Sequence, residues 1–282
     1  MLVRACRPRQ WSKNLLVLAA PAAAGVLDRG VVLAQLAGAF VALCAISSAT
    51  YLVNDVRDRE DDRLHPQKRY RPVAAGELSV RAALVSAVAL AVFGLSLATA
   101  INWKLGALGV GYLALTASYS LWWRSIAVLD ILVIAAGFVL RAFAGGAATD
   151  IYLSRYFVIV TACCAIFLVA AKRYAEQRER AIRRAVRATL AKYSPAQLRW
   201  TLVLAAVAAS VTYATWALTR PSNIAWYVCS TVPFVLWLAR YATLVAGGIG
   251  EAPEELILRD RLLLALTGVW ALLFLAGVYV GR

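Results

Sequence analysis

The chain has 282 residues, and 62% of them are hydrophobic. Soluble domains usually hold roughly 45–50% apolar residues, so the composition excludes an ordinary soluble fold. The formal net charge of +15 would suit a nucleic-acid binder, but the cytoplasmic loops of membrane proteins carry the same excess of Lys and Arg, and we favour that explanation. The five cysteines, without CxxC spacing, and the single histidine argue against a thiolate or imidazole metal cluster and against a Ser-His-Asp triad.

Apolar blocks recur along the whole chain, and a block of about 20 residues can cross a bilayer as a helix. We predict an all-α polytopic membrane protein with about nine transmembrane helices, in a single membrane-embedded domain covering residues 1–282. The first span is the weakest, because it is short and contains Pro21. The predicted spans are Leu15–Val26, Val32–Val53, Ala82–Ile101, Leu105–Trp123, Ile126–Ala148, Tyr156–Ala171, Thr201–Leu218, Ile224–Val245 and Leu262–Val280.

The Lys and Arg residues fall mainly in alternate connections, which indicates a cytoplasmic N-terminus and an outer C-terminus. Two long loops, Asn54–Arg81 and Lys172–Arg199, lie on the predicted cytoplasmic side. The outer connections are short and nearly featureless. We therefore expect the chemistry at the cytoplasmic face, on these two loops.

The second predicted span ends in an acidic run, NDVRDREDD, at positions 54–62. If the helix continues beyond the membrane, Asn54, Asp58 and Asp62 share one face, and Tyr51 lies one turn earlier. Mg²⁺ prefers oxygen ligands and usually joins one or two carboxylates to substrate phosphates. Stacked carboxylates repel one another without a cation, so we predict a Mg²⁺ site. The alternative is a polar loop whose acids pair with the neighbouring arginines at positions 57, 59 and 63.

A basic run, KRYRP, follows at positions 68–72. Its Lys68, Arg69 and Arg71 can hold phosphate oxygens through charge-assisted hydrogen bonds. The alternative is that they contribute only to the charge asymmetry across the membrane. Beside an acidic Mg²⁺ strip we favour the phosphate site. Tyr119 and Arg124, near the end of the fourth span, are weaker candidates, since such residues are commonly interface anchors.

Arg141 lies well inside the fifth predicted span. A charge at that depth is expensive and usually lines a cavity or meets a partner. We interpret Arg141 as a contact for a substrate phosphate in a central cavity. A pairing with Asp130 or with a backbone carbonyl is the structural alternative.

These residues resemble the UbiA superfamily of intramembrane prenyltransferases, whose first aspartate-rich motif is similar to Asn54-Asp55-x-x-Asp58-x-x-x-Asp62. The resemblance covers nearly the whole chain and implies a UbiA-like bundle, with a central cavity open to the cytoplasmic side and the membrane, in a bacterial plasma membrane. Four stretches are similar to a phosphoribosyltransferase branch of the superfamily: RPRQWSKN at 7–14, NDVRD at 54–58, HPQKRYRP at 65–72 and KRYAE at 172–176.

The chain departs from the wider superfamily at its second aspartate-rich motif, where Lys172 and Arg173 replace acidic residues. The resemblance therefore implies one Mg²⁺-diphosphate site and a second, cationic region suited to a metal-free anion. The implied reaction moves a 5-phosphoribosyl group from phosphoribosyl pyrophosphate to a polyprenyl (decaprenyl) monophosphate, in arabinan precursor synthesis for the cell wall. The acceptor is already an anion, so no strong base is needed.

The resemblance also implies roles for individual residues. The metal ligands would be Asn54, Asp58 and Asp62, and the catalytic residues Asp58, Lys172 and Glu176. Substrate would be bound by Lys13, Tyr51, Asp55, Lys68, Arg69, Arg71, Tyr119, Arg124, Arg141, Lys172 and Arg173. The expected partners are these two substrates and membrane lipids, without nucleic acid. Whether the protein forms a homo-oligomer is left open.

Two other functions compete with this interpretation. The first is a UbiA-type prenyltransferase that acts on an aromatic acceptor, which the loss of the second acidic motif disfavours. The second is a secondary transporter, since transporters also bury charges near the bilayer midplane. A dense acidic strip at the membrane surface fits transport less well.

Overall fold

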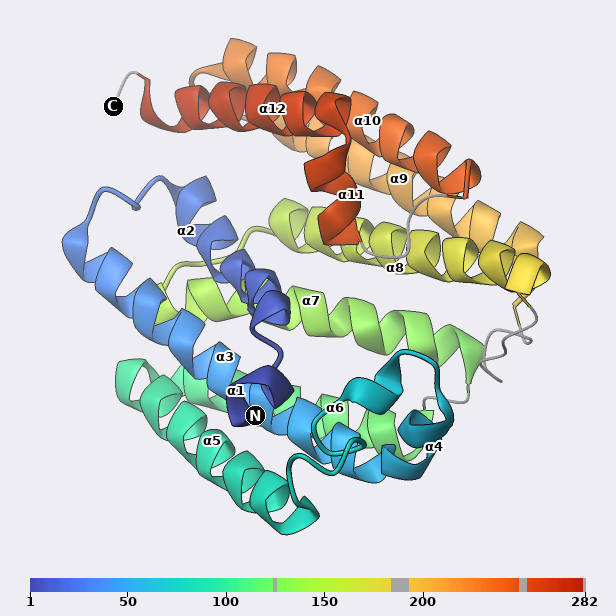
Figure 1. Cartoon of the computed structure of the whole chain (residues 1–282). Coiled ribbons are helices and arrows are strands. Elements are labelled where there is room, and N and C mark those ends of the chain that lie inside the picture. Colours follow the sequence, from blue (N-terminus) through green and yellow to red (C-terminus); the bar gives the residue numbers. More distant parts are fainter. Residues whose placement is uncertain (124–125, 184–192, 249–252, 281–282) are drawn as a thin grey trace. The chain divides into compact units, whose positions relative to one another are not determined.

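The computed structural model describes residues 1–123, 126–183, 193–248 and 253–280, and no strand occurs among them. The chain divides into two compact units. The first comprises Met1–Pro21, Val26–Trp122 and Leu140–Tyr152, and the second comprises Ala22–Gly25, Trp123–Val139 and Leu153–Arg282. The all-α prediction is confirmed, and Figure 1 shows the helices in chain order. The prediction of a single functional domain stays a prediction.

The first unit is built on the long helix α3, which packs against α5, α6 and the 3₁₀ helix η1. The short helix α4 and the 3₁₀ turn η2 lie in the connection between α3 and α5. α2 and α7 contribute residues to both units. The bounds are α1 Leu2–Ala5, η1 Pro8–Leu18, α2 Ala19–Ala24, α3 Gly30–Arg57, α4 Arg59–Leu64, η2 Lys68–Tyr70, α5 Val80–Ile101, α6 Trp103–Leu121 and α7 Ala127–Thr149.

Besides its parts of α2 and α7, the described residues of the second unit form four long helices and one short one. α8 packs along α9, and α10 packs along both α9 and α12. A buried core around Phe167, Leu238 and Tyr241 holds these helices together. The bounds are α8 Arg155–Arg183, α9 Pro195–Leu218, α10 Ile224–Ala246, α11 Pro253–Arg259 and α12 Arg261–Tyr279.

Seven described helices, namely α3, α5, α7, α8, α9, α10 and α12, are long and apolar enough to cross a membrane. Six of them begin within two residues of a predicted span, and α9 begins six residues before the predicted Thr201. Of the two other predicted spans, the first is η1 followed by α2, and the fourth is α6, which is not among these seven helices. The chain is a multi-pass membrane protein, and the count of nine spans stays a prediction.

The second predicted loop differs from expectation. α8 continues to Arg183, so the loop predicted to begin at Lys172 begins as helix. Residues 184–192 of that loop lie outside the described residues. α9 then starts at a capping box, in which the Ser194 side chain accepts from the Gln197 amide and the Gln197 side chain accepts from the Ser194 amide.

One glycine permits an unusually close packing contact in the first unit. A Cβ atom added to Gly145, in α7, would lie 1.8 Å from the carbonyl oxygen of Val17, in η1. Because no side chain larger than hydrogen fits there, η1 rests directly on the α7 backbone. This contact fixes which residues of η1 and α7 face each other.

Candidate functional site

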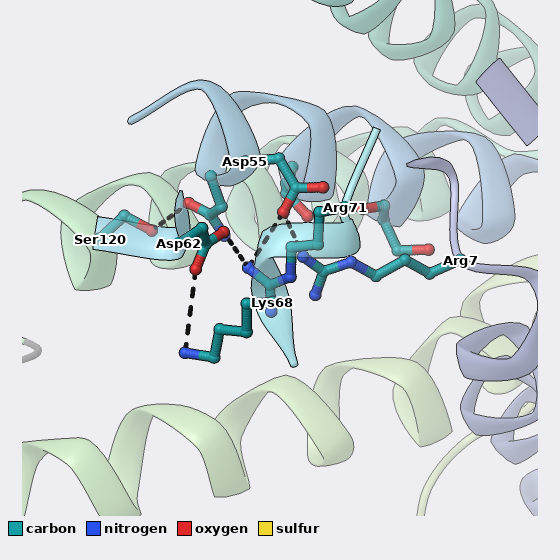
Figure 2. A network of polar contacts seen from close by, with 9 residues as sticks. Arg7, Asp55, Asp62, Lys68, Arg71 and Ser120 are labelled. Atoms are coloured by element: carbon teal, nitrogen blue, oxygen red, sulfur yellow. Dashed lines mark hydrogen bonds and ion pairs between the residues drawn. The ribbon is translucent and has the colours of Figure 1, made fainter. Parts of the chain in front are cut away.

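The predicted acidic strip lies where α3 ends and α4 begins (Figure 2). The amides of Asp58 and Asp62 donate to the carbonyls of Asn54 and Asp58, at 2.9 and 2.8 Å, so a spacing of about one turn is kept. The regular helix is nevertheless interrupted at Asp58, and the expected continuous helix through Asp62 was wrong. The reason lies in charge: acidic residues are unfavourable at a helix C-terminus and favourable in the first turn of a new helix, where the acids at positions 60–62 now stand.

Two acids of the run are buried and held by arginines from outside it (Figure 2). Arg71 Nη1 donates to Asp62 Oδ2 at 2.6 Å and to Asp55 Oδ1 at 3.3 Å. Arg7 Nη2 also donates to Asp55 Oδ1, and the Arg7 guanidinium lies 5.1 Å from the ring centroid of Tyr51. Lys68 Nζ is 4.0 Å from Asp62 Oδ1. These cations balance the two buried carboxylates.

The alternative that the acids pair with neighbouring arginines holds for Glu60. Arg63 donates to both carboxylate oxygens of Glu60, at 3.1 and 3.0 Å, and the Arg59 Nε lies 3.8 Å from the same carboxylate. Glu60 is exposed, so this pairing is an ordinary surface contact. The buried acids are held differently, by Arg7, Lys68 and Arg71 from outside the run.

Asn54 and Asp58 present the other oxygen atoms of the motif, and both side chains are half-buried. Ser120, near the end of α6, donates to Asn54 Oδ1 at 2.7 Å, which orients the amide (Figure 2). Tyr119, the residue before Ser120, is also half-buried. Arg124 lies outside the described residues. Among the residues that the structure describes, no group of three His, Cys, Asp or Glu side chains could hold a metal ion without help.

The basic run is folded around a local turn. His65 Nδ1 accepts from the amides of Gln67 and Lys68, at 3.2 and 3.3 Å. Desolvation, and then the nearby Lys68 cation, lower the pKa of His65, so the ring is a neutral acceptor at pH 7. Arg69 is exposed and donates to the Tyr70 hydroxyl at 2.6 Å. The turn leaves Lys68 and Arg71 as the cations of the run that contact the acidic motif.

Arg141 is buried in the part of α7 that belongs to the first unit. Its Nε donates to Asn14 Oδ1 at 2.8 Å, and its Nη2 donates to the Tyr112 hydroxyl at 2.6 Å. The guanidinium also lies 4.8 Å from the Tyr112 ring centroid. Asn14 comes from η1 and Tyr112 from α6, so three elements of one unit meet at this cation.

The cationic motif of the second unit is less exposed than its sequence suggests. Arg173 is buried and donates to Asp130 through Nε at 2.6 Å and through Nη2 at 3.0 Å. Its Nη1 donates to Glu176 at 2.6 Å. Asp130, the sequence-based alternative for Arg141, is therefore a partner of Arg173. Lys172 is half-buried on the same helix.

The end of α8 is tied to the start of α9. Gln177 Nε2 donates to the carbonyl of Tyr193 at 2.6 Å. Burial, and then the neighbouring Asp130 carboxylate, raise the pKa of Tyr193 to about 12, so this phenol stays protonated at neutral pH. Arg173, Glu176 and their neighbours thus form a fixed network within the second unit.

The profile of the UbiA prenyltransferase family matches residues 15–259 of the chain. The chain belongs to this family. Decaprenyl-phosphate phosphoribosyltransferase of Corynebacterium glutamicum is 42% identical over 99% of this chain and 87% of that protein. The protein of the same name from Mycolicibacterium smegmatis is 40% identical over 99% of this chain and 92% of its own length. The protein of that name from Mycobacterium tuberculosis is 42% identical over 95% of this chain and 91% of its own length.

Solved structures show that the fold is that of UbiA proteins. A UbiA homolog from Archaeoglobus fulgidus bound to DMAPP and Mg²⁺ matches with a TM-score of 0.73 and 20% identity, over 99% of this chain and 97% of that chain. The same homolog bound to GPP and Mg²⁺ matches with a TM-score of 0.70 and 19% identity, over 99% and 98%. At this identity the likeness concerns the fold alone.

The oxygen ligands that this UbiA chain offers fit one Mg²⁺ ion whose remaining coordination positions would be filled by substrate oxygens. Asn54 and Asp58 offer an amide oxygen and a carboxylate about one turn apart, and Mg²⁺ commonly takes few protein ligands and several from substrate phosphates. Asp62 fits less well as a direct ligand, because its two oxygens face Arg71 and Lys68.

In the first unit, sequence reasoning gave no site role to four residues that make specific contacts: Arg7, Asn14, Tyr112 and Ser120. Arg7 and Asn14 lie in a stretch that carries the family resemblance, yet nothing in it indicates which partners they meet. Tyr112 and Ser120 lie in α6 without a surrounding motif. The one usable signal was the depth of Arg141, which requires polar partners from other helices.

Proposed function

We propose that this UbiA protein transfers a 5-phosphoribosyl group from phosphoribosyl pyrophosphate to a polyprenyl monophosphate and releases pyrophosphate. The observation that carries the proposal is the 40–42% identity, over 95–99% of the chain, to three proteins named decaprenyl-phosphate phosphoribosyltransferase. Decaprenyl phosphate is accordingly the acceptor we expect. The arrangement of Asn54 and Asp58 supports a diphosphate donor.

Asn54 and Asp58 are the residues that would hold Mg²⁺ against the donor diphosphate. A bound Mg²⁺ stabilises the negative charge that develops on the leaving pyrophosphate. Ser120 keeps the Asn54 oxygen oriented, and Arg71 holds Asp62 beside the motif. Mg²⁺ in the family's solved homologs supports this assignment. The role of Asp62 is then to position Arg71 and Lys68, in addition to any contact with the ion.

The bond changes require little proton transfer. The bond between C1 of the ribose and the pyrophosphate oxygen breaks, and its electron pair leaves with the pyrophosphate. An oxygen of the lipid phosphate forms the new bond to C1. Because that phosphate is ionised at neutral pH, no residue has to remove a proton, which agrees with the turn-forming role of His65. Lys13, Lys68, Arg69 and Arg141 are the proposed contacts for substrate phosphates.

The two cations of the motif in α8, Lys172 and Arg173, have different roles in this proposal. Arg173 is engaged by Asp130 and Glu176, so we assign it to holding α8 in place. Lys172 is the better candidate for a direct contact with a substrate phosphate. Glu176 orients Arg173 in this proposal and does not act as a base.

The setting of the reaction follows from its substrates. A polyprenyl phosphate is confined to the membrane, and the donor is soluble and made inside the cell. We therefore place the protein in the bacterial plasma membrane, with Asn54 and Asp58 at the cytoplasmic face. The product is a precursor for arabinan in the cell wall.

The experiment is turnover by the purified protein with phosphoribosyl pyrophosphate, decaprenyl phosphate and Mg²⁺, with the lipid product measured by mass spectrometry. A product heavier than the acceptor by one phosphoribosyl group is expected, and EDTA should abolish it. A parallel reaction with a prenyl diphosphate and 4-hydroxybenzoate tests the prenyltransferase alternative. Prenylation of the aromatic acid without phosphoribosyl transfer would refute the proposal.

A further inference from the structure

The buried amide of Asn14 connects three elements of the first unit. Its Oδ1 accepts from Arg141 Nε in α7 at 2.8 Å. Its Nδ2 donates to Cys44 Sγ at 3.2 Å and lies 3.4 Å from Ser47 Oγ, both in α3. The residue is 1% exposed and Arg141 is 6% exposed. Both ends of the amide are therefore used, and its orientation is fixed.

The close contact between η1 and α7 explains why these two side chains meet. Val17 lies against Gly145, with the Val17 carbonyl where a Cβ would be. Asn14 stands three residues before Val17, and Arg141 stands four residues, or one helical turn, before Gly145. The backbone contact at Gly145 thus brings Asn14 to the guanidinium of Arg141.

We propose that Asn14 is a positioning residue, which orients Arg141 toward a phosphate monoester of a substrate while leaving the positive charge of the cluster intact. The decisive feature is that position 14 holds an amide and not a carboxylate. Aspartate has nearly the same shape and would bind Arg141 more strongly, through a charge-assisted hydrogen bond. It would also cancel the charge that a buried guanidinium offers to an anion. Asparagine orients the guanidinium and adds no charge.

Contacts along α3 link the Arg141 cluster to the acidic motif within the same unit. Asn14 Nδ2 lies 3.4 Å from Ser47 Oγ, one helical turn before Tyr51 in α3, and the Arg7 guanidinium lies 5.1 Å from the Tyr51 ring centroid. Arg7 in turn contacts Asp55. A phosphate at Arg141 would therefore lie in the same polar region as the proposed diphosphate site, so this inference rests on the proposed function. The phosphate monoester is either the 5-phosphate of the donor or the lipid phosphate.

The test compares Asn14→Asp with Asn14→Ala and with Asn102→Asp. Asn102 caps α6 in the same unit, where its side chain accepts from the Lys104 amide, and aspartate serves equally well as a helix cap. It is therefore a matched control for the added charge. Steady-state KM and kcat are measured for each substrate in turn. Ligand-induced thermal stabilisation is measured separately with phosphoribosyl pyrophosphate and with decaprenyl phosphate.

Asn14→Asp is expected to unfold at the wild-type temperature or above it, and to raise KM for one of the two substrates at least about tenfold, with a smaller effect on kcat. The substrate whose KM rises identifies the phosphate that Arg141 contacts. Asn14→Ala should lower kcat, because Arg141 loses its orientation. Asn102→Asp should match the wild type. Wild-type KM values and wild-type ligand-induced stabilisation in Asn14→Asp would overturn the inference.

The binding measurement separates this inference from the proposed function. If the wild type transfers no phosphoribosyl group, the proposed function fails, yet stabilisation by a phosphate ligand that Asn14→Asp removes would still support the role of Asn14. If Asn14→Asp does not fold, Tyr112→Phe decides, since it removes one hydrogen bond to Arg141 without adding charge. It should raise KM for one substrate about two- to tenfold, and unchanged values for both would overturn the inference.

Discussion

The two compact units each contain an arginine–carboxylate network, and the two networks differ in how far their arginines are exposed. In the first unit the acids are buried: the Asp55 and Asp62 side chains are 1% and 3% exposed, whereas Arg7 and Arg71 are 27% and 26% exposed. In the second unit the cation is buried as well: Arg173 is 4% exposed, and its partners Asp130 and Glu176 are 3% and 20% exposed. The first arrangement presents cations to its surroundings, and the second encloses one.

The first network is therefore suited to binding a ligand, whereas the second supports the fold. A partly exposed arginine on a buried acid keeps donors available for a phosphate, while its position is fixed from behind. A buried arginine with two carboxylates has its donors directed at the protein. The sequence motifs look equally basic, yet we expect only the first network to respond to substrate.

The largest expected effect comes from Asp58→Asn, which removes the carboxylate that the acidic motif offers to Mg²⁺. Transfer should fall by more than about 10³-fold, because the charge on the leaving pyrophosphate is no longer stabilised. Membrane insertion and thermal stability should be unchanged. Asp61→Asn, an exposed acid three residues later, is the matched control. Normal turnover by purified Asp58→Asn would disprove the metal assignment.

Arg173→Met should show that the second network is structural. Removal of the guanidinium takes from Asp130, which is 3% exposed, the cation that donates to both of its oxygens, at a cost of about 3–5 kcal/mol in the free energy of unfolding. The measurement is denaturant unfolding in detergent. The double variant Arg173→Met/Asp130→Leu should recover much of that loss. A single variant as stable as the wild type would place Arg173 outside the supporting network.

Arg71→Met should cost less stability than Arg173→Met and more affinity. Asp55 keeps Arg7, and Asp62 keeps Lys68, so the cost to the free energy of unfolding should be about 1–3 kcal/mol. KM for phosphoribosyl pyrophosphate should rise, which steady-state kinetics will measure. Equal stability losses for the two arginine variants would remove the distinction between the networks.

Lys172→Ala gives the smallest expected effect. Stability should stay at the wild-type value, and KM for one phosphorylated substrate should rise about tenfold. Lys104→Ala is a suitable control, since Lys104 pairs with the exposed Asp150 through an exposed contact outside both networks. Lys172 has no part in the reaction if the KM values for both substrates are unaffected.

The helices could be predicted from the sequence because a membrane span follows from local composition alone. The predicted span Ala82–Ile101 corresponds to the observed α5, Val80–Ile101, and the predicted Leu262–Val280 corresponds to α12, Arg261–Tyr279. The interruption at Asp58 was not predicted, because the pattern of carboxylates suits a continuous helix equally well. Only the helix dipole and the contacts of Asp62 favour a new helix start.

The sequence indicated which types of ligand and charge the site contains, but it did not indicate which side chains contact one another. The motif indicated oxygen ligands at Asn54 and Asp58, and the depth of Arg141 indicated buried partners. The partners themselves are far away in the sequence: Arg7 and Asp55 are 48 residues apart, and Asp130 and Arg173 are 43 apart. Such pairs depend on how helices cross, which composition and periodicity do not determine.

The contact between η1 and α7 also has a consequence for biogenesis. Asn14 and Arg141 are separated by 127 residues, so a ribosome that adds about 5–20 residues per second needs about 6–25 s to produce the second partner after the first. During that interval the N-terminal segment can already contact α3, and it waits for α7 to supply the guanidinium. The η1 segment thus reaches its final environment only after α7 has been made, and an insertion machinery has to tolerate it until then.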